Sequence, residues 1–372
     1  MIRKNSNFIP VFQPYISRND YVKLLITLKE KNISGTSPTV TEFEQHIAKF
    51  VDRKFAVSVS NGTVALELAL LALDFEIGDE IILPSFTIVS VLSAVIRSGA
   101  KPVFCDVDAE SWNMTSKNIE KLITQKTKAV IMVHTYGLPA DALEIEKLCK
   151  INNLYLIEDA AEAHGQTIHN RKCGSFGILS IFSFYANKHI TTGEGGCILT
   201  NDKYLNEKIG NMKNLDFSKY SRFQHNNMYW NYRLGALQAY LGISQIKNIN
   251  KIIEYKIKQG KYYNFLLKDY TDMFQLPLAE YSLSNNNYWV YGLVSKKKIP
   301  NNFFISELLN ANIETRPFFY PLHLQPFLND KYRNEDLPVS EYLGNFGFYL
   351  PTGSHINKKK QKYIVNKLLS LI

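Results

Sequence analysis

Cysteine is scarce in this sequence. The 372 residues include four: Cys105, Cys149, Cys173 and Cys197. They are scattered, with no C-x-x-C pair and no histidines at the spacing of a zinc site. This absence argues against a disulfide framework or a zinc module, so we predict reduced, mostly buried thiols and no bound metal.

Long hydrophobic runs are also missing. No stretch approaches the roughly 20 apolar residues that a bilayer span requires, and Met1–Lys4 is not followed by a signal-peptide pattern. We therefore expect a cytoplasmic protein without a membrane partner. With 45% hydrophobic and 21% charged residues, the chain has a water-soluble composition and is long enough for a large domain and a smaller one.

A concentrated basic band is the third missing feature. The net charge is +9, yet the lysines are spread along the chain and do not alternate with aromatic residues. The runs 296–298 and 358–360 are interpreted as exposed loop and helix-start charges. We expect no nucleic-acid partner, although the positive field would favour an anionic substrate.

Strands and helices alternate through the first two thirds of the chain, which predicts an α/β fold with a mostly parallel sheet covered by helices on both faces. The helices include Ile88–Ser98 and Ala142–Ile151. The predicted strands are Phe55–Ser60, Glu80–Leu83, Pro102–Asp106, Ala129–Val133, Leu154–Glu158, Leu179–Phe184 and Gly195–Leu199.

The character of the sequence changes near residue 246. A long lysine-rich helix is expected from there to Leu267, followed by strands near Tyr288–Ser295 and helices at Ile305–Ala311 and Lys359–Ile372. We predict a large domain over residues 1–245 and a small C-terminal α+β domain over 246–372. The N-terminal segment is expected to pack with the small domain.

Lys188 lies in an aromatic and glycine-rich run, Phe182–Gly196. Burial disfavours the charged form of an amine, and a neutral lysine can form a Schiff base with an aldehyde. Most lysines are solvated surface charges, so the hypothesis that Lys188 binds a cofactor depends on the motifs around it.

Asp159 follows the apolar strand 154–158. The carboxyl end of such a strand faces the ligand crevice of an α/β fold. A carboxylate there can keep a pyridine nitrogen protonated, which makes pyridoxal phosphate an electron sink. Glu162, one turn later, could approach the ring hydroxyl. The alternative for Asp159 is a turn or helix cap.

Gly62 and Thr63 connect a strand to the start of an apolar helix. Free backbone N–H groups and the positive end of the helix dipole suit a phosphate at such a point. The same Ser-Asn-Gly-Thr turn is also ordinary helix-capping chemistry.

A phosphate turn, a strand-end Asp and a strand-end Lys in this order resemble the fold-type I enzymes that depend on pyridoxal phosphate. Nearly the whole chain resembles the DegT/DnrJ/EryC1/StrS sugar aminotransferases, and within them the GDP-perosamine synthases, which aminate C4 of GDP-4-keto-6-deoxymannose. The segments that carry the resemblance are Ile33–Thr36, Ser60–Thr63, Gly78–Thr87, Val133–Ala140, Leu154–Gly165, Phe182–Gly196, Asn231–Arg233 and Ile313–His323.

The resemblance implies a seven-stranded sheet with the last strand antiparallel, a pyridoxal 5'-phosphate cofactor and a homodimer with shared active sites. Lys188 would anchor the cofactor and then act as the general base and acid. Asp159 would pair with the pyridine nitrogen, and Glu162 would lie beside the ring hydroxyl. The phosphate would be bound by Gly62, Thr63 and Ser183, and by Asn231 of the neighbouring subunit.

Two positions depart from the family pattern. Ile88 stands where relatives carry an aromatic residue that stacks on the cofactor ring, so either Ile88 covers the ring or Phe86 takes that role. Around Asn231, the usual Gly two positions earlier is replaced by Tyr229, and the expected Ala-Ala pair of the next helix reads Gln238-Ala239. Because this region is implied to build the substrate pocket, the acceptor can differ from that of perosamine synthases.

Arg316, Tyr320 and His323 lie in a segment that resembles the substrate-facing loop of the family. A guanidinium can bind a phosphate or carboxylate through its planar fork. The alternative is that Pro317 and Pro321 make a rigid turn in which the neighbouring aromatic residues simply pack. For His134, after the strand 129–133, we favour a packed and hydrogen-bonded role.

Three functions remain open from the sequence. The first is transfer of nitrogen from L-glutamate to a 4-keto-6-deoxy sugar nucleotide for surface polysaccharides. The second keeps this chemistry with a small phosphorylated ketone, such as dihydroxyacetone phosphate, as the acceptor. The third is a non-catalytic regulator, against which the presence of Lys188, Asp159 and Ser183 argues.

Overall fold

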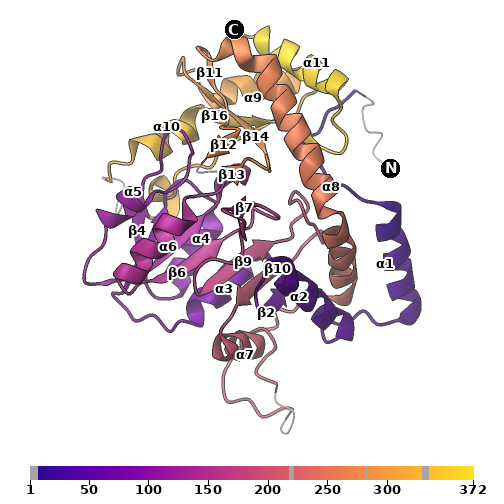
Figure 1. Ribbon diagram of the computed structural model, residues 1–372, viewed down its shortest axis with the longest axis vertical. Coiled ribbons are helices and arrows are strands. Elements are labelled where there is room, and N and C mark those ends of the chain that lie inside the picture. The colour runs from indigo at the N-terminus through magenta and orange to yellow at the C-terminus, as the bar shows by residue number, and fades with distance from the viewer. Residues whose placement is uncertain (1–6, 218–221, 282–283, 329–334) are drawn as a thin grey trace.

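The computed structural model describes residues 7–217, 222–281, 284–328 and 335–372. Its centre is a seven-stranded sheet in the order β2-β10-β9-β6-β5-β3-β4, seen in Figure 1. Only β10 among these strands runs antiparallel to its neighbours. The strands are β2 (Phe55–Val59), β3 (Glu80–Pro84), β4 (Lys101–Cys105), β5 (Thr127–Val133), β6 (Tyr155–Asp159), β9 (Leu179–Ser183) and β10 (Gly196–Thr200). The predicted fold class is confirmed.

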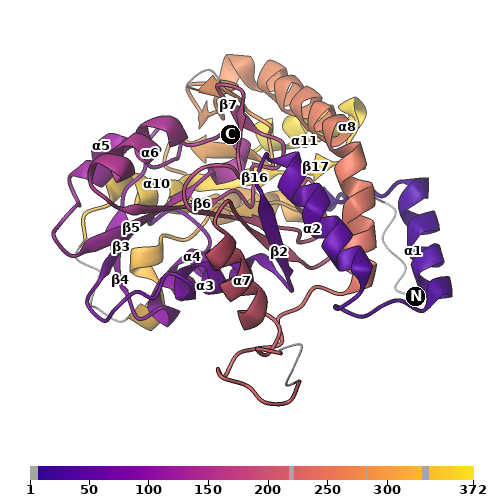
Figure 2. The same ribbon diagram turned by 60° about the horizontal axis from the view of Figure 1, so that its bottom comes forward.

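Alternation along the strands explains the two helical layers, because successive side chains point to opposite faces of a sheet. In β3, Ile81 and Leu83 pack into one core and Ile82 into the other. The first core contains α3 (Gly62–Leu71), α4 (Val89–Arg97) and α7 (Lys203–Met212). The second contains α2 (Pro38–Phe50), α6 (Ala142–Ile151) and the start of α8 (Ala236–Leu267). Figure 2 shows the sheet between these layers.

A second sheet lies at the other end of the molecule. It has the order β11-β14-β16-β15 and is entirely antiparallel. Its own core includes Phe274, Phe304 and Phe348. The elements of this part are β11 (Phe274–Gln275), β14 (Tyr291–Ser295), β15 (Arg316–Pro317), β16 (Gly347–Leu350), α9 (Asn301–Asn310), α10 (Pro338–Phe346) and α11 (Lys358–Leu369).

The start of the chain lies beside this second sheet. Ile9 bridges Ile313 and belongs to the same core. Strand β1 (Phe12–Gln13) pairs in parallel with β17 (Thr352–Gly353). Helix α1 (Arg18–Glu30), which begins at a capping box formed by Ser17 and Asp20, then packs along α8.

The long helix differs from its prediction. It begins at Ala236 rather than near residue 246, so the expected domain boundary falls inside a continuous helix. Its first turns are helical because Ala236, Ala239 and Ile243 are buried against the large sheet's core. Helices α1 and α2 had not been predicted, and α9 begins four residues before the expected Ile305, directly after Pro300.

Short elements complete the structure: α5 (Ser116–Glu120), β7 (Thr167–Ile168), β8 (Arg171–Lys172), β12 (Glu280–Tyr281), β13 (Ser284–Asn285), and the 3-10 turns Thr135–Gly137, Lys268–Tyr270, Leu322–Leu324 and Pro326–Leu328. None of the helices in the described ranges combines the length and apolar character needed to cross a bilayer.

Candidate active site

A cavity of about 680 Å³ lies at the carboxyl ends of the central strands. Asp159 ends β6 and Ser183 ends β9, so the parallel pairing of these strands brings the two residues to one edge. Gly62 begins α3 directly after Asn61, three residues after β2 ends, at the same edge. Of the predicted residues, the cavity wall contains Gly62, Thr63, Ile88, Asp159, Glu162, Ser183 and Lys188.

Lys188 lies in the loop after β9 with 10% of its side chain exposed. Its Nζ atom is 3.4 Å from Oε1 of Glu162 and 3.8 Å from the ring centroid of Trp289. Trp289 also donates from Nε1 to the carbonyl oxygen of Asn187, at 2.9 Å. The amine is therefore held between a carboxyl group and an aromatic face.

Asp159 and Glu162 are both buried. Burial raises the pKa of Asp159 to about 6 and that of Glu162 to about 7, while the charge of Lys188 opposes both shifts. Asp159 accepts a hydrogen bond from the N–H of Ala161, and Glu162 accepts one from the N–H of Tyr136. Two carboxyl groups poised near neutral pH beside a lysine are typical of sites that move protons.

The start of α3 forms a cradle for a phosphate. Asn61 accepts from the N–H of Val64 through its side chain and from that of Ala65 through its backbone. Gly62 and Thr63 thus stand at the positive end of the helix, where backbone N–H groups suit an anion. A Cβ atom on Gly62 would lie 2.8 Å from Cβ of Ser183, so only glycine leaves this space open.

Ile88 and Phe86, the two candidates for covering the cofactor ring, differ in their access to the cavity. Ile88 lines the cavity and is 43% exposed, whereas Phe86 is fully buried. Phe86 packs instead against Tyr136, Phe318 and Phe319. Of the two candidates, Ile88 is therefore the one that reaches the cavity, whose wall also contains the aromatic residues Trp289 and Phe319.

Three residues expected to face the substrate are not brought to this cavity. Arg316 is exposed and pairs with Glu314, and Tyr320 is about half exposed. His323 has no exposed surface: Nδ1 shares a hydrogen bond with Oγ of Ser85, and Nε2 lies 3.3 Å from Glu341. In this structure the ring of His323 is packed between Ser85 and Glu341 and lies outside the cavity wall, so its contact with a substrate stays a prediction.

Asn231 is also outside the cavity of its own chain. It is exposed and forms a backbone bridge with Asn214. Trp289, by contrast, belongs to the cavity and was missed. Its only sequence signal was its place at the start of an apolar strand, which is equally typical of a core residue.

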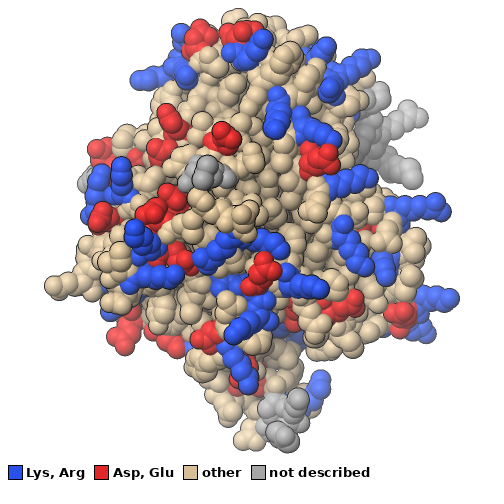
Figure 3. Space-filling view, viewed as in Figure 1, with Lys and Arg blue, Asp and Glu red and all other residues tan. Residues whose placement is uncertain are grey.

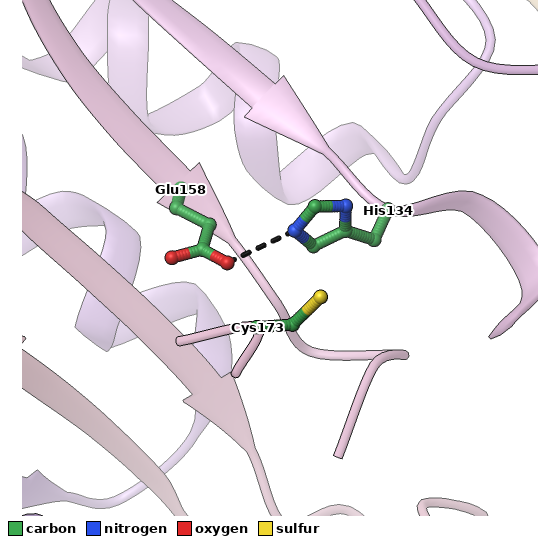
Figure 4. A group of neighbouring side chains, drawn as sticks. All are labelled: His134, Glu158 and Cys173. Carbon is green, nitrogen blue, oxygen red and sulfur yellow. Dashed lines mark hydrogen bonds and ion pairs between the residues drawn. The ribbon is translucent and has the colours of Figure 1, made fainter. Parts of the chain in front are cut away.

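A second group of titratable residues lies next to Asp159, at the ends of β5 and β6. Figure 4 shows His134 and Glu158 pointing toward each other beside Cys173, and Nε2 of His134 is 2.9 Å from Oε1 of Glu158. Nδ1 of His134 accepts from the N–H of Ala140, which leaves the proton on Nε2 to be donated to Glu158.

The Glu158 carboxylate is saturated by further donors. It accepts from the backbone N–H groups of Gly174, at 2.6 Å, and Phe176, at 2.8 Å. With both ring nitrogens of His134 also engaged, this group ties β5 and β6 to the loop before β9. The packed role predicted for His134 agrees with this geometry.

The arrangement defines an α/β enzyme of the fold-type I aminotransferase class. The chain belongs to the DegT/DnrJ/EryC1/StrS aminotransferase family, whose pattern it matches over residues 15–369.

Similar proteins cover almost the whole chain. A GDP-perosamine synthase of Escherichia coli O157:H7 is 35% identical over 361 residues, covering 97% of this chain and 98% of the relative. A GDP-perosamine synthase of Vibrio cholerae is 34% identical over 363 residues, covering 96% and 97%. The solved structure of an aminotransferase from Psychrobacter cryohalolentis is 27% identical, with a TM-score of 0.90 and 98% of each chain covered.

The protein is thus a sugar aminotransferase of this family that uses pyridoxal phosphate. The residues present fit this cofactor: an amine for its aldehyde, a strand-end carboxyl for its ring nitrogen and a glycine-walled cradle for its phosphate. When bound, the cofactor supplies an electron sink for the carbon that loses a proton.

Proposed function

We propose that this chain transfers the amino group of L-glutamate to a 4-keto-6-deoxy sugar nucleotide, most simply a GDP-linked one, in the cytoplasm and for surface polysaccharide biosynthesis. The convergence of Lys188, Asp159 and Glu162 in one cavity carries the proposal. The two GDP-perosamine synthases support the choice of acceptor, since each covers nearly the whole chain.

Each of these side chains has a defined task in the proposal. Nζ of Lys188 binds the cofactor. Once it is released from the cofactor, the same amine acts as the base that removes a proton from one carbon atom and as the acid that returns this proton to another carbon atom. Asp159 holds a proton on the ring nitrogen. Oε1 of Glu162, 3.4 Å from Nζ, exchanges a proton with the amine or holds it in place. Gly62, Thr63 and Ser183 orient the phosphate.

A half-reaction tests the acceptor. The enzyme is loaded with pyridoxamine phosphate, the excess is removed, and GDP-4-keto-6-deoxymannose or dihydroxyacetone phosphate is added separately while absorbance reports return of the pyridoxal form. We expect return with the sugar nucleotide alone. Return with dihydroxyacetone phosphate alone would replace the acceptor by a small phosphorylated ketone, and no return with either would overturn both choices.

Two controls complete this experiment. L-glutamate should convert the pyridoxal form to the pyridoxamine form, and failure to do so would reject the donor. The variant Lys188→Ala should fold, with an unchanged circular dichroism spectrum, and show no turnover. Turnover by this variant would show that another group is the base.

We also propose a homodimer with shared active sites. Helix α1 packs one face on α8 and leaves an apolar face exposed, formed by Tyr21, Val22, Leu25, Ile26 and Leu28. Such an exposed patch is typical of an interface. Leu25→Glu should yield a monomer by light scattering, whereas Tyr204→Glu, at an equally exposed position on α7, should leave the dimer intact.

Subunit mixing tests the shared site. If Asn231 serves the partner's cavity, Lys188→Ala and Asn231→Ala are each impaired, yet a heterodimer of the two contains one site with both native residues. Mixing under conditions of subunit exchange should restore about one quarter of the native activity. An unchanged low activity, with exchange verified by mass, would place Asn231 outside the shared site.

A further inference from the structure

A second cavity, the basic cavity, lies behind the loop that carries Lys188. Its volume is about 360 Å³. Asn187 and Lys188 line both cavities, whereas His189 lines the second one alone. Its wall comes from β1, α8, the 187–189 loop and the turn after β17. The residues that the argument uses are Tyr15, Lys188, His189, Lys251, Lys256 and Lys258.

The charges of this wall are unbalanced. It contains Lys188, Lys251, Lys256 and Lys258, but Glu254 is its only acid. Glu254 is mostly exposed and already pairs with Lys258, at 2.5 Å. On the outer face shown in Figure 3, by contrast, Lys and Arg are interspersed with Asp and Glu.

Lys256 is the decisive residue. It is 5% exposed, and its Nζ atom donates to Oγ1 of Thr352 at 2.6 Å. Among the described residues, no carboxylate forms an ion pair with it. Burial lowers the pKa of Lys256 to about 7, and no acid opposes that shift. A buried ammonium without a counterion is costly, so an anion would be bound favourably beside it.

His189 gives a second, independent observation. The residue is 4% exposed and lines the same wall. Nε2 lies 3.3 Å from the carbonyl oxygen of Asn287, while Nδ1 is buried without a partner in the described structure. Because Nε2 donates to that carbonyl oxygen, Nδ1 is a hydrogen-bond acceptor, which a protonated oxyanion can satisfy. The wall thus leaves two buried groups incomplete: the acceptor of His189 and the amine of Lys256, which lacks a carboxylate partner among the described residues.

We propose that the basic cavity is a binding site for an oxyanion, a phosphate or a carboxylate group, held by Lys256 with Lys251 at its rim. Nζ of Lys251 lies 3.3 Å from the hydroxyl of Tyr15, which places this second cation at the wall formed by the N-terminal segment. Because His189 directly follows Lys188, the site adjoins the reactive amine without being part of the phosphate cradle at Gly62.

Calorimetric titration of the enzyme loaded with pyridoxal phosphate tests this site. Inorganic phosphate is one probe, and glutarate, which has two carboxylates and no amine, is the other. Loading fills the cofactor's own phosphate cradle, so binding there is not measured. We expect at least one probe to bind, and Lys256→Met to weaken that binding at least tenfold.

The matched control is Lys258→Met. This lysine belongs to the same wall, but it is exposed and paired with Glu254, so its loss should change the affinity less than threefold. Lys256→Met keeps the length of the side chain and removes a buried charge, so its melting temperature should be equal to or higher than that of the wild type.

The two probes identify the source of the anion. If Lys256→Met weakens the binding of phosphate alone, the natural ligand carries a phosphate group. If it weakens the binding of glutarate alone, the natural ligand carries a carboxylate group. Either result supports the site. No binding of either probe to the wild type, or equal affinity in the wild type and Lys256→Met, overturns it. Neither result bears on the amino acceptor, which the half-reaction tests separately.

Discussion

The ammonium of Lys188 lies over the indole of Trp289, with 3.8 Å between Nζ and the ring centroid. The indole is fixed by its hydrogen bond to the carbonyl oxygen of Asn187 and by stacking on Tyr136. A residue from the start of the second sheet thus sets the position of the reactive amine on the first.

Trp289→Phe should lower kcat about tenfold. The variant keeps an aromatic face but loses the Nε1–H donor and part of the cation–π attraction, each worth about 1 kcal/mol. Stopped-flow absorbance should show slower attachment of pyridoxal phosphate to Lys188. Trp112→Phe is the matched control, because Trp112 is equally buried and also packs on Tyr136 but lies outside the cavity wall. An equal decrease of kcat in both variants would mean that Trp289 contributes only through packing.

Gly62→Ala should weaken cofactor binding while preserving the fold. The added methyl group would lie 2.8 Å from Cβ of Ser183, inside the proposed phosphate cradle. We expect at least a tenfold higher dissociation constant for pyridoxal phosphate, measured by absorbance titration. Gly210→Ala in α7 meets nothing within 4 Å and should instead stabilise the protein by about 0.5–1 kcal/mol. Unchanged cofactor affinity in Gly62→Ala would contradict the cradle.

The raised pKa of Glu162 predicts a pH dependence of stability in the cofactor-free protein. Its pKa is about 7 in the folded state and 4.5 as an ordinary Glu, so between these values the folded state binds more protons than the unfolded state. The free energy of unfolding therefore falls as pH rises from 5 to 8, by up to about 3 kcal/mol from this group.

Urea unfolding at pH 5 and pH 8 checks this sign. Relative to Glu162→Gln, the wild type should lose stability between the two pH values. Glu254→Gln should show no comparable change, because pairing with Lys258 lowers the pKa of Glu254 and does not raise it. A constant difference between wild type and Glu162→Gln would mean that Glu162 is not desolvated as described.

Glu158→Gln should destabilise the protein by about 3–5 kcal/mol. Glutamine retains the shape but places an N–H₂ group against one of the donors from His134, Gly174 and Phe176, which leaves buried donors unpaired. Thermal and denaturant unfolding measure the loss. A metal chelator should leave the melting temperature of the wild type unchanged, and a large decrease would show that the group with His134 and Cys173 holds an ion.

The large sheet was predictable because its strands are apolar runs, most of which end at, or are followed directly by, Ser or Asp, and these local signals coincide with burial on both faces. The start of α8 was not predictable from the sequence, because Asn231–Gly235 carries no strong helix-start signal. This end of the helix is instead fixed by the packing of Ala236 and Ala239. Helix α1 escaped prediction for a related reason: it leaves Leu25 and Leu28 exposed, so its pattern lacks a clean polar face.

The site could be predicted in part. Asp159 ends a strand, and Gly62 and Lys188 lie within a few residues of strand ends, so the order of the strands brings all three to one edge of the sheet. Trp289 and His323 depend on how distant segments fold back, which no local spacing reveals. Ser85, for example, fixes the ring of His323 from a position far earlier in the chain.

Helix α8 is long enough to connect the two parts of the molecule. Its 32 residues span about 48 Å, and it contacts α1 and α2 near one end and α11 near the other. A rotation of about 5° around the first end would carry the second by about 4 Å. Trp289 packs in the same core as the first turns of α8, so a tilt of the far end would leave the aromatic cover of Lys188 in place and keep water from the reactive amine.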